Sequence, residues 1–310
     1  MEITTETVVV VTGASSGIGR ITTLKLLEAG ASVVACSRPS ELLNELARDA
    51  EALPGRLVAV EGDVADSGTA RRLAGVAVES FGHLDVWVNN AAVMAFGAFN
   101  QVPEEAFRRV IDVNLHGYAN GARAALDQFR RQGRGLLVNV SSVLGKLSGP
   151  NMSPYVASKF AIQGMCEVLR CELTGSPIRV CNVLPGGVNT SLYRDCANYT
   201  GRNVRPLYPL QRAEAVAETV LKTIRRPRRE RRVGRAARVQ LLAHLISPKI
   251  YEQVVGRVFP LMLFGRDKVP AGPGNLFEPA PAPRPGMKPR GVSVWGSAVK
   301  QEAEHVAQPH

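Results

Sequence analysis

The stretch that decides the fold reads Val8-Val9-Val10-Val11-Thr12-Gly13-Ala14-Ser15-Ser16-Gly17-Ile18-Gly19. Its four consecutive valines are typical of a strand that is buried on both faces of a sheet. Apolar residues then recur at helical spacing, at Ile21, Leu24 and Leu27. A strand, a glycine-rich turn and a helix therefore follow one another, which is the setting of a dinucleotide-binding turn.

The glycines of this turn each have a physical use. Gly13 permits a tight turn, Gly17 lets backbone N–H groups approach a pyrophosphate, and Gly19 lets the helix lie close to the strand. The N-terminus of the helix adds unpaired N–H groups and a positive dipole end. Two other interpretations of this turn remain open at this stage. It could be a loop without a ligand, or the nucleophile elbow of hydrolases, which Gly13-x-Ser15-x-Gly17 also matches.

Length and composition limit the protein class. The 310 residues suffice for one large domain plus an extension, with 45% hydrophobic and 21% charged residues. A net charge of +11 permits attraction to nucleic acid or an anionic membrane without requiring either. Five cysteines without a C-x-x-C pair argue against a disulfide framework and a zinc site, so we expect no metal. The N-terminus lacks the pattern of a secretory signal, and we expect a cytoplasmic protein with peripheral membrane contact as an alternative.

Strand and helix patterns alternate along the chain, which predicts a Rossmann-type α/β fold: a doubly wound parallel sheet with helices on both faces. The expected strands are 8–12, 32–37, 57–61, 84–89, 135–141 and 178–184. The expected helices are 17–29, 41–50, 67–80, 104–131 and 153–173. In such folds ligands bind beyond the carboxyl ends of the strands, so the residues just after each strand are expected to share one crevice.

The dipeptide after the second strand bears on the choice of cofactor. A carboxylate there binds the ribose 2′-OH of NAD, but this chain has Ser37 and Arg38. Arginine pairs with a 2′-phosphate, which a carboxylate would repel. The sequence therefore favours NADP(H), with NAD(H) as the alternative.

A second motif lies at the start of the helix 153–173. We expect Ser153 at the N-cap and Pro154 at the first helical position, which places Tyr155 and Lys159 on one face. An ammonium beside a phenol favours the phenolate and would lower the pKa of Tyr155. Tyr155 is thereby a candidate general acid or base.

These motifs together resemble the short-chain dehydrogenase/reductase family over about residues 7–190. The resemblance rests on the turn Thr12–Gly19, Asp63, Asn89-Asn90-Ala91, Asn114, Ser142, Tyr155 with Lys159, and Pro185-Gly186-x-Val188-x-Thr190. The hydrolase reading fails, because Ser15 follows the first strand and no acid and histidine follow in the order that an elbow serine needs.

The resemblance implies a role for each matched residue. Tyr155 would exchange a proton with the substrate oxygen, which Ser142 would orient. Lys159 would lower the pKa of Tyr155 and hold the nicotinamide ribose, and Asn114 would hold a water linked to Lys159. The cofactor would be bound by the turn and the later strand ends: Thr12, Gly13, Ser15, Ser16, Gly17, Ile18, Gly19, Ser37, Arg38, Asp63, Val64, Asn90, Ala91, Tyr155, Lys159, Pro185, Gly186, Val188 and Thr190.

The implied activity is oxidoreduction between a small-molecule carbonyl and an alcohol, in a homodimer or homotetramer. We expect a catalytic domain over residues 1–238, with a lid at about 191–212, and an extension over 239–310 that is first apolar and helical, then rich in Pro and Gly. Two rival hypotheses use the extension: a membrane-surface reductase of lipid-like substrates, and a cofactor-binding interaction protein. The arginine run 225–232 has no interleaved aromatic residues, which argues against nucleic acid.

Overall fold

The computed structural model describes residues 1–206, 208–234 and 236–279, without the side chains of residues 236–238. Its strands are β1 (Val8–Thr12), β2 (Ser32–Ser37), β3 (Arg56–Glu61), β4 (Val86–Asn89), β5 (Ala95–Phe96), β6 (Gly135–Val140), β7 (Ile178–Pro185), β8 (Ala197–Asn198), β9 (Arg202–Val204), β10 (Glu230–Val233) and β11 (Phe264–Lys268). Its α-helices are α1 (Gly17–Glu28), α2 (Glu41–Ala50), α3 (Ser67–Phe81), α4 (Glu104–Ile111), α5 (Gly117–Gln132), α6 (Ser153–Glu172), α7 (Ala213–Arg225), α8 (Ala236–Ile246) and α9 (Pro248–Leu263).

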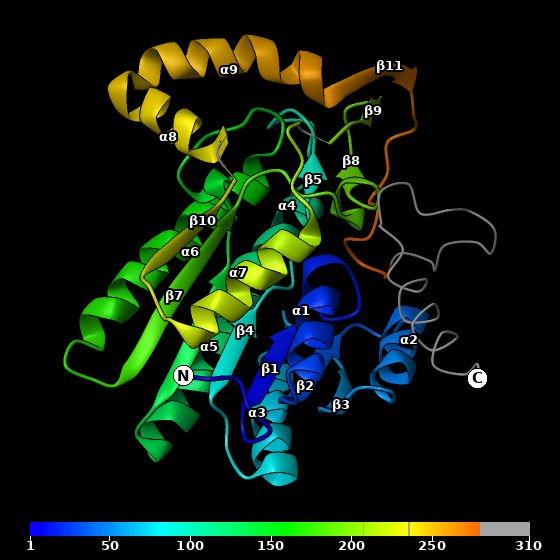
Figure 1. Ribbon diagram of the computed structural model, residues 1–310. Coiled ribbons are helices and arrows are strands. Elements are labelled where there is room, and N and C mark those ends of the chain that lie inside the picture. Colours follow the sequence, from blue (N-terminus) through cyan, green and yellow to red (C-terminus); the bar gives the residue numbers. More distant parts are fainter. Residues whose placement is uncertain (207, 235, 280–310) are drawn as a thin grey trace, which may run out of the picture.

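Seven of the described strands form one parallel sheet in the order β10-β7-β6-β4-β1-β2-β3 (Figure 1). The order reverses beside β1, and ligands of open α/β sheets bind at such a switch point. The predicted fold class is therefore confirmed, and the glycine-rich turn lies at the position where the fold places its ligand.

The valine run of β1 is buried because helices cover both faces of the sheet. Val9 and Val11 belong to one core cluster with side chains of α1, α2 and α7. Val8 and Val10 belong to a second cluster with side chains of α3, α5 and α6. Alternate residues of one strand thus enter opposite cores, which explains why the run is continuously apolar.

The predicted strands and helices of residues 8–185 agree with the structure to within a residue or two at most ends. Two local features differ. The helix α6 begins at Ser153 with Met152 at its N-cap, so Ser153 is not the N-cap residue, and its buried hydroxyl finds no partner among the described residues. The long helix expected over 104–131 is interrupted by a π-helical turn at Asp112–His116, a feature that often marks functional sites.

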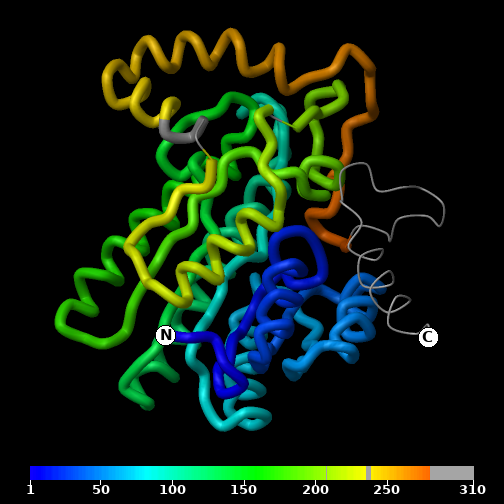
Figure 2. Tube along the Cα trace, viewed as in Figure 1, coloured from blue at the N-terminus to red at the C-terminus, as the bar shows by residue number. Residues whose placement is uncertain are grey.

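The extension continues from β10 into α8 and α9, which lie outside the sheet layers (Figure 1). Ser247 caps α9, and Pro248 occupies its first turn. Beyond α9, β11 pairs antiparallel with β9 of the predicted lid. The following segment, orange in Figure 2, runs back along the body toward the turn between β1 and α1.

The boundary between residues 238 and 239 remains a prediction, and the tail 280–310 lies outside the described residues. In the part that is described, no helix combines the length and apolar character needed to cross a membrane.

Candidate active site

The turn between β1 and α1 has the geometry that its glycines permit. Gly13 and Gly17 have φ angles of 65° and 52°, in the left-handed region that favours glycine. A Cβ on Gly13 would lie 2.7 Å from the Ala91 Cα, and a Cβ on Gly19 would overlap the Gly13 carbonyl oxygen. The turn is thus packed so tightly that side chains at Gly13 and Gly19 are excluded.

Hydrogen bonds to the end of β4 hold this turn in place. The Asn90 backbone N–H donates to the Thr12 hydroxyl at 3.0 Å. The Asn90 side-chain amide donates to the carbonyl oxygens of Thr12 and Gly13, at 2.9 and 3.2 Å. Helix α1 has no acidic residue in its first turn, so its positive dipole end is not neutralised locally. The turn suits the phosphates of a dinucleotide.

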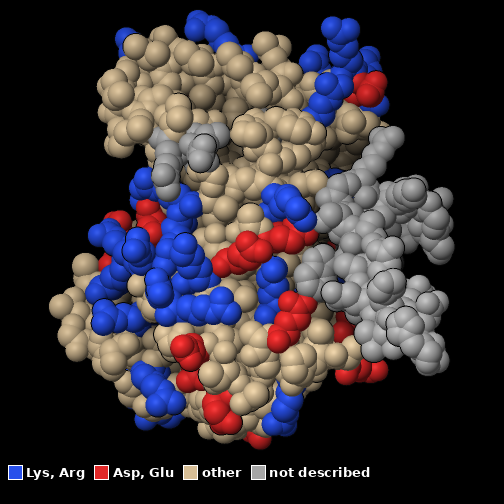
Figure 3. Space-filling view, viewed as in Figure 1, with Lys and Arg blue, Asp and Glu red and all other residues tan. Residues whose placement is uncertain are grey.

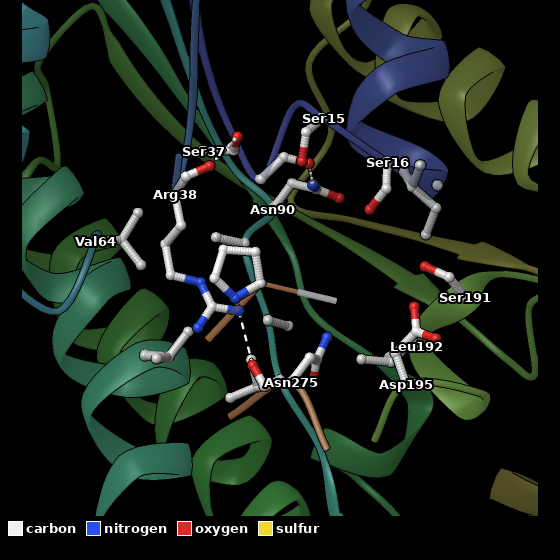
Figure 4. Close-up of a pocket in the computed structure, with 18 of the residues that line it drawn as sticks. Ser15, Ser16, Ser37, Arg38, Val64, Asn90, Ser191, Leu192, Asp195 and Asn275 are labelled. Carbon is white, nitrogen blue, oxygen red and sulfur yellow. Dashed lines mark hydrogen bonds between the residues drawn. The ribbon is translucent and has the colours of Figure 1, made fainter. Parts of the chain in front are cut away.

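A cleft of about 210 Å³ lies over the carboxyl ends of the strands (Figure 4). Fourteen predicted site residues line it: Gly13, Ser15, Ser16, Gly17, Ile18, Ser37, Arg38, Asp63, Val64, Asn90, Ala91, Tyr155, Lys159 and Thr190. Seven do not line it as it stands: Thr12, Gly19, Asn114, Ser142, Pro185, Gly186 and Val188. Of these, Thr12 and Gly19 support the turn from behind.

Tyr155 and Lys159 project from the first turns of α6 into this cleft, and both are almost fully buried. The Lys159 ammonium lies 5.5 Å from the centre of the Tyr155 ring and 4.8 Å from that of Tyr118. It donates to the Val140 carbonyl oxygen at 3.3 Å and to the Tyr118 hydroxyl at 3.4 Å. The lysine is therefore held between the end of β6 and the two phenols.

Burial dominates the ionisation of this pair. Desolvation lowers the pKa of Lys159 to about 7, and desolvation also raises the pKa of Tyr155 above its ordinary value. A hydrogen bond with Ser142 opposes the rise in the Tyr155 pKa without cancelling it. The pKa of Tyr155 thus moves in the direction opposite to the predicted one, because burial of the phenolate is the largest cause of its shift.

Ser142 and Asn114 are held by their surroundings. Ser142 follows β6, and its hydroxyl accepts a hydrogen bond from the Leu144 N–H at 3.1 Å. The Asn114 amide accepts from the Val93 N–H at 2.9 Å, and donates to the Val93 carbonyl oxygen at 3.0 Å and to the Ser158 hydroxyl at 3.2 Å. Its side chain thereby connects the segment after β4 to α6, three residues along from Tyr155.

Arg109 is a site residue that the sequence reasoning missed. It comes from α4, lines the cleft and forms an ion pair with Asp63. Its Nε also donates to the Leu276 carbonyl oxygen at 2.8 Å. No local motif indicates Arg109, since its partners are 46 and 167 residues away in the sequence.

The comparisons with known proteins agree with this geometry. The short chain dehydrogenase family model matches residues 7–198. The chain belongs to the short-chain dehydrogenase/reductase family. It is an oxidoreductase of this family that depends on NAD(P).

Three proteins are similar to this chain over most of its length. The chain is 33% identical to "Uncharacterized oxidoreductase YxnA" of Bacillus subtilis. The alignment spans 258 residues, which are 81% of this chain and 72% of the relative. The chain is 35% identical over 217 residues to "3-oxoacyl-[acyl-carrier-protein] reductase FabG" of Thermotoga maritima, at 69% and 88% coverage. A short chain dehydrogenase from Burkholderia cenocepacia, crystallised in complex with NADP, aligns with a TM-score of 0.69 at 29% identity, over 82% of this chain and 99% of the other.

Proposed function

We propose that this protein is an NADP(H)-dependent oxidoreductase that interconverts a carbonyl and an alcohol, with Tyr155 as general acid in reduction and general base in oxidation. The observation that carries the proposal is the meeting of Tyr155 and Lys159 in the cleft that begins at the glycine-rich turn. NADP(H) would supply or accept the hydride. The protein would supply position and the proton.

Each residue of the site has a task in this scheme. The Tyr155 phenol, whose pKa burial holds above its ordinary value, is protonated at neutral pH and can donate its proton to a carbonyl oxygen in the direction of reduction. Ser142 orients that oxygen through its hydroxyl. A pKa of about 7 suits Lys159 to give up and regain a proton near neutral pH. Asn114 is a positioning residue, because its side chain is committed to Val93 and Ser158.

We assign the cofactor preference to Arg38. Its guanidinium lines the cleft next to Ser37, at the end of β2, where an NAD site has a carboxylate. Arg109 adds a second guanidinium, but its charge is paired with Asp63. Arg38 is therefore the better candidate partner for a 2′-phosphate.

The test is a panel of ketones and aldehydes with NADPH, monitored by the loss of cofactor absorbance. We expect reduction by the wild type, and a loss of at least 100-fold in kcat in Tyr155→Phe, as is typical of a removed general acid. Tyr208→Phe is the matched control, because Tyr208 is 70% exposed in the lid region. Turnover in Tyr155→Phe equal to that of the control would refute the assignment.

The proposal includes a homodimer or homotetramer in the cytoplasm. Helix α6 exposes the apolar side chains of Phe160 and Val168, which favours a contact between subunits there. All five cysteines are free thiols, as is usual in a reducing compartment. Sedimentation of the wild type and of Phe160→Ser would test the assembly, and a monomeric wild type would refute it.

A second candidate function is reduction of lipid-like substrates at an anionic membrane surface. Helices α8 and α9 expose an apolar face, which is mostly tan in Figure 3, formed by Val239, Leu242, Leu245, Ile246, Ile250, Val254, Val258, Leu261 and Met262. Over residues 248–268 the exposed basic side chains Lys249, Arg257, Arg266 and Lys268 outnumber Glu252 and Asp267. An apolar helix face flanked by basic residues fits an anionic bilayer surface.

Vesicle sedimentation tests this second candidate. Vesicles containing phosphatidylserine should bind the wild type at low salt, and Ile250→Ser/Val254→Ser should bind less. Equal binding to neutral vesicles, no binding, or a dimer that dissociates in the variant would each count against a membrane partner.

A further inference from the structure

The segment Gly272–Pro279, here named the strap, lies across one end of the cofactor cleft. Gly272 exchanges two backbone hydrogen bonds with Asn198, at 2.9 and 3.0 Å. The Asn275 N–H donates to the Asp195 carbonyl oxygen at 2.7 Å. The Leu276 side chain is fully buried in the core cluster that also contains Tyr155. The strap is therefore anchored both to the lid region and to the body.

The strap also engages Arg38, the proposed partner of the 2′-phosphate. The Arg38 Nη2 donates to the Asn275 carbonyl oxygen at 2.7 Å, shown as a dashed line in Figure 4, and Nη1 donates to the Leu276 carbonyl oxygen at 3.1 Å. Arg109 donates to the same Leu276 oxygen. Two backbone carbonyls thus lie against the guanidinium on which the preference for NADP(H) depends.

This arrangement has two consequences for a nucleotide. The carbonyl oxygens use donors of Arg38 and would repel phosphate oxygens placed beside them. The cleft of about 210 Å³ is also smaller than the roughly 300–1,000 Å³ of most ligand pockets. Asn275 and Pro279 of the strap are among the residues that line it. The strap in this position therefore occupies the place beside the Arg38 guanidinium that a 2′-phosphate would take.

One buried polar atom of the strap lacks a hydrogen bond in this position. The buried Oδ1 of Asn275 has no hydrogen-bond partner among the described residues. Leaving a buried acceptor unsatisfied costs free energy, and this cost is relieved when the strap lifts and water reaches the amide. The unsatisfied Asn275 amide therefore destabilises the closed position of the strap, whereas the buried Leu276 side chain and the hydrogen bonds from Arg38 and Arg109 stabilise it.

We propose that the strap is a latch that determines cofactor specificity: it withholds Arg38 from the 2′-phosphate, and NADP(H) selectivity appears only when the strap releases that guanidinium. The inference rests on the proposed use of NADP(H). Because Asp195 and Asn198 hold the strap and belong to the lid region, a nucleotide that displaces the strap also loosens the lid over the substrate side.

The test uses the full-length chain with Leu276→Ser, which weakens the buried anchor. Dissociation constants for NADPH, NADH, 2′,5′-ADP and 5′-AMP are measured by calorimetry. We expect the selectivity for NADPH over NADH to rise about tenfold, the equivalent of one hydrogen bond to a charged group. The preference for 2′,5′-ADP over 5′-AMP should rise equally. Phe277→Ser, at a neighbouring side chain that is 48% exposed, is the control and should change neither ratio.

Two further measurements test the latch. The gain should vanish in Leu276→Ser/Arg38→Ala, because the latch acts through Arg38. In the wild type, 2′,5′-ADP should speed hydrogen exchange at the amides of Asn275 and Leu276 more than 5′-AMP does, which tests the latch even where Leu276→Ser fails to fold. Unchanged selectivity in a folded Leu276→Ser, or equal exchange with both nucleotides, would overturn the latch. Absence of binding by either dinucleotide in the wild type would instead overturn the proposed function.

Discussion

Lys159→Met should change how the stability of the protein depends on pH. Burial lowers the pKa of Lys159 from 10.5 to about 7 in the folded protein. Below pH 7 the lysine is protonated in both states, so folding must bury an ammonium at full cost. A shift of this size corresponds to about 5 kcal/mol. Between pH 7 and 10.5 the unfolded chain binds more protons than the folded one, so the free energy of unfolding rises with pH.

The methionine variant lacks this titration while keeping a side chain of similar length. Its hydrogen bonds to Val140 and Tyr118 are lost at every pH, which shifts its stability by a nearly constant amount. Between pH 7 and 9 the wild type should therefore gain about 2 kcal/mol relative to Lys159→Met. The measurement is urea denaturation of both proteins, without nucleotide, at half-unit steps from pH 6 to 10.

Lys222→Met serves as the control, since it makes the same substitution at a lysine that is exposed on α7. The reasoning is refuted if the difference between wild type and Lys159→Met stays constant across the window. It is refuted equally if the wild type loses stability relative to the variant as pH rises, since that would mean a raised lysine pKa.

Two glycine substitutions should have opposite effects on the fold and the site. Gly19→Ala places a Cβ against the Gly13 carbonyl oxygen, so the turn must shift. We expect about 1–3 kcal/mol of destabilisation and at least tenfold weaker binding of dinucleotide. An unaltered Kd for the dinucleotide would contradict the packing described. Gly256→Ala adds a methyl group to an exposed position within α9 that has no atom within 4 Å, so thermal denaturation should show stabilisation of about 1 kcal/mol, and a lower Tm would contradict the open space there.

The sequence predicts the sheet and most of the site because the information is local. A valine run, glycines at fixed spacing and the Tyr155/Lys159 pair each lie within one segment, and the fold then places the ends of β1, β2, β3, β4 and β6 in one crevice. The contributions of Arg109 and Leu276 are not local, since α4 and the strap meet Asp63 and Arg38 only in three dimensions. The direction of the Tyr155 pKa shift does not follow from the motif, because the largest cause of the shift is burial, which no motif reports.

The central claim is that Tyr155 protonates a substrate oxygen while a hydride reaches the adjacent carbon. The most direct measurement is label transfer from NADPH that carries deuterium at both C4 positions, with a ketone that the panel identifies as a substrate. The account predicts deuterium on the carbinol carbon of a single product enantiomer with the wild type, and no labelled product above background with Tyr155→Phe at a cofactor Kd equal to that of the wild type. Product hydrogen that comes from solvent, or equal labelling by Tyr155→Phe, would contradict it.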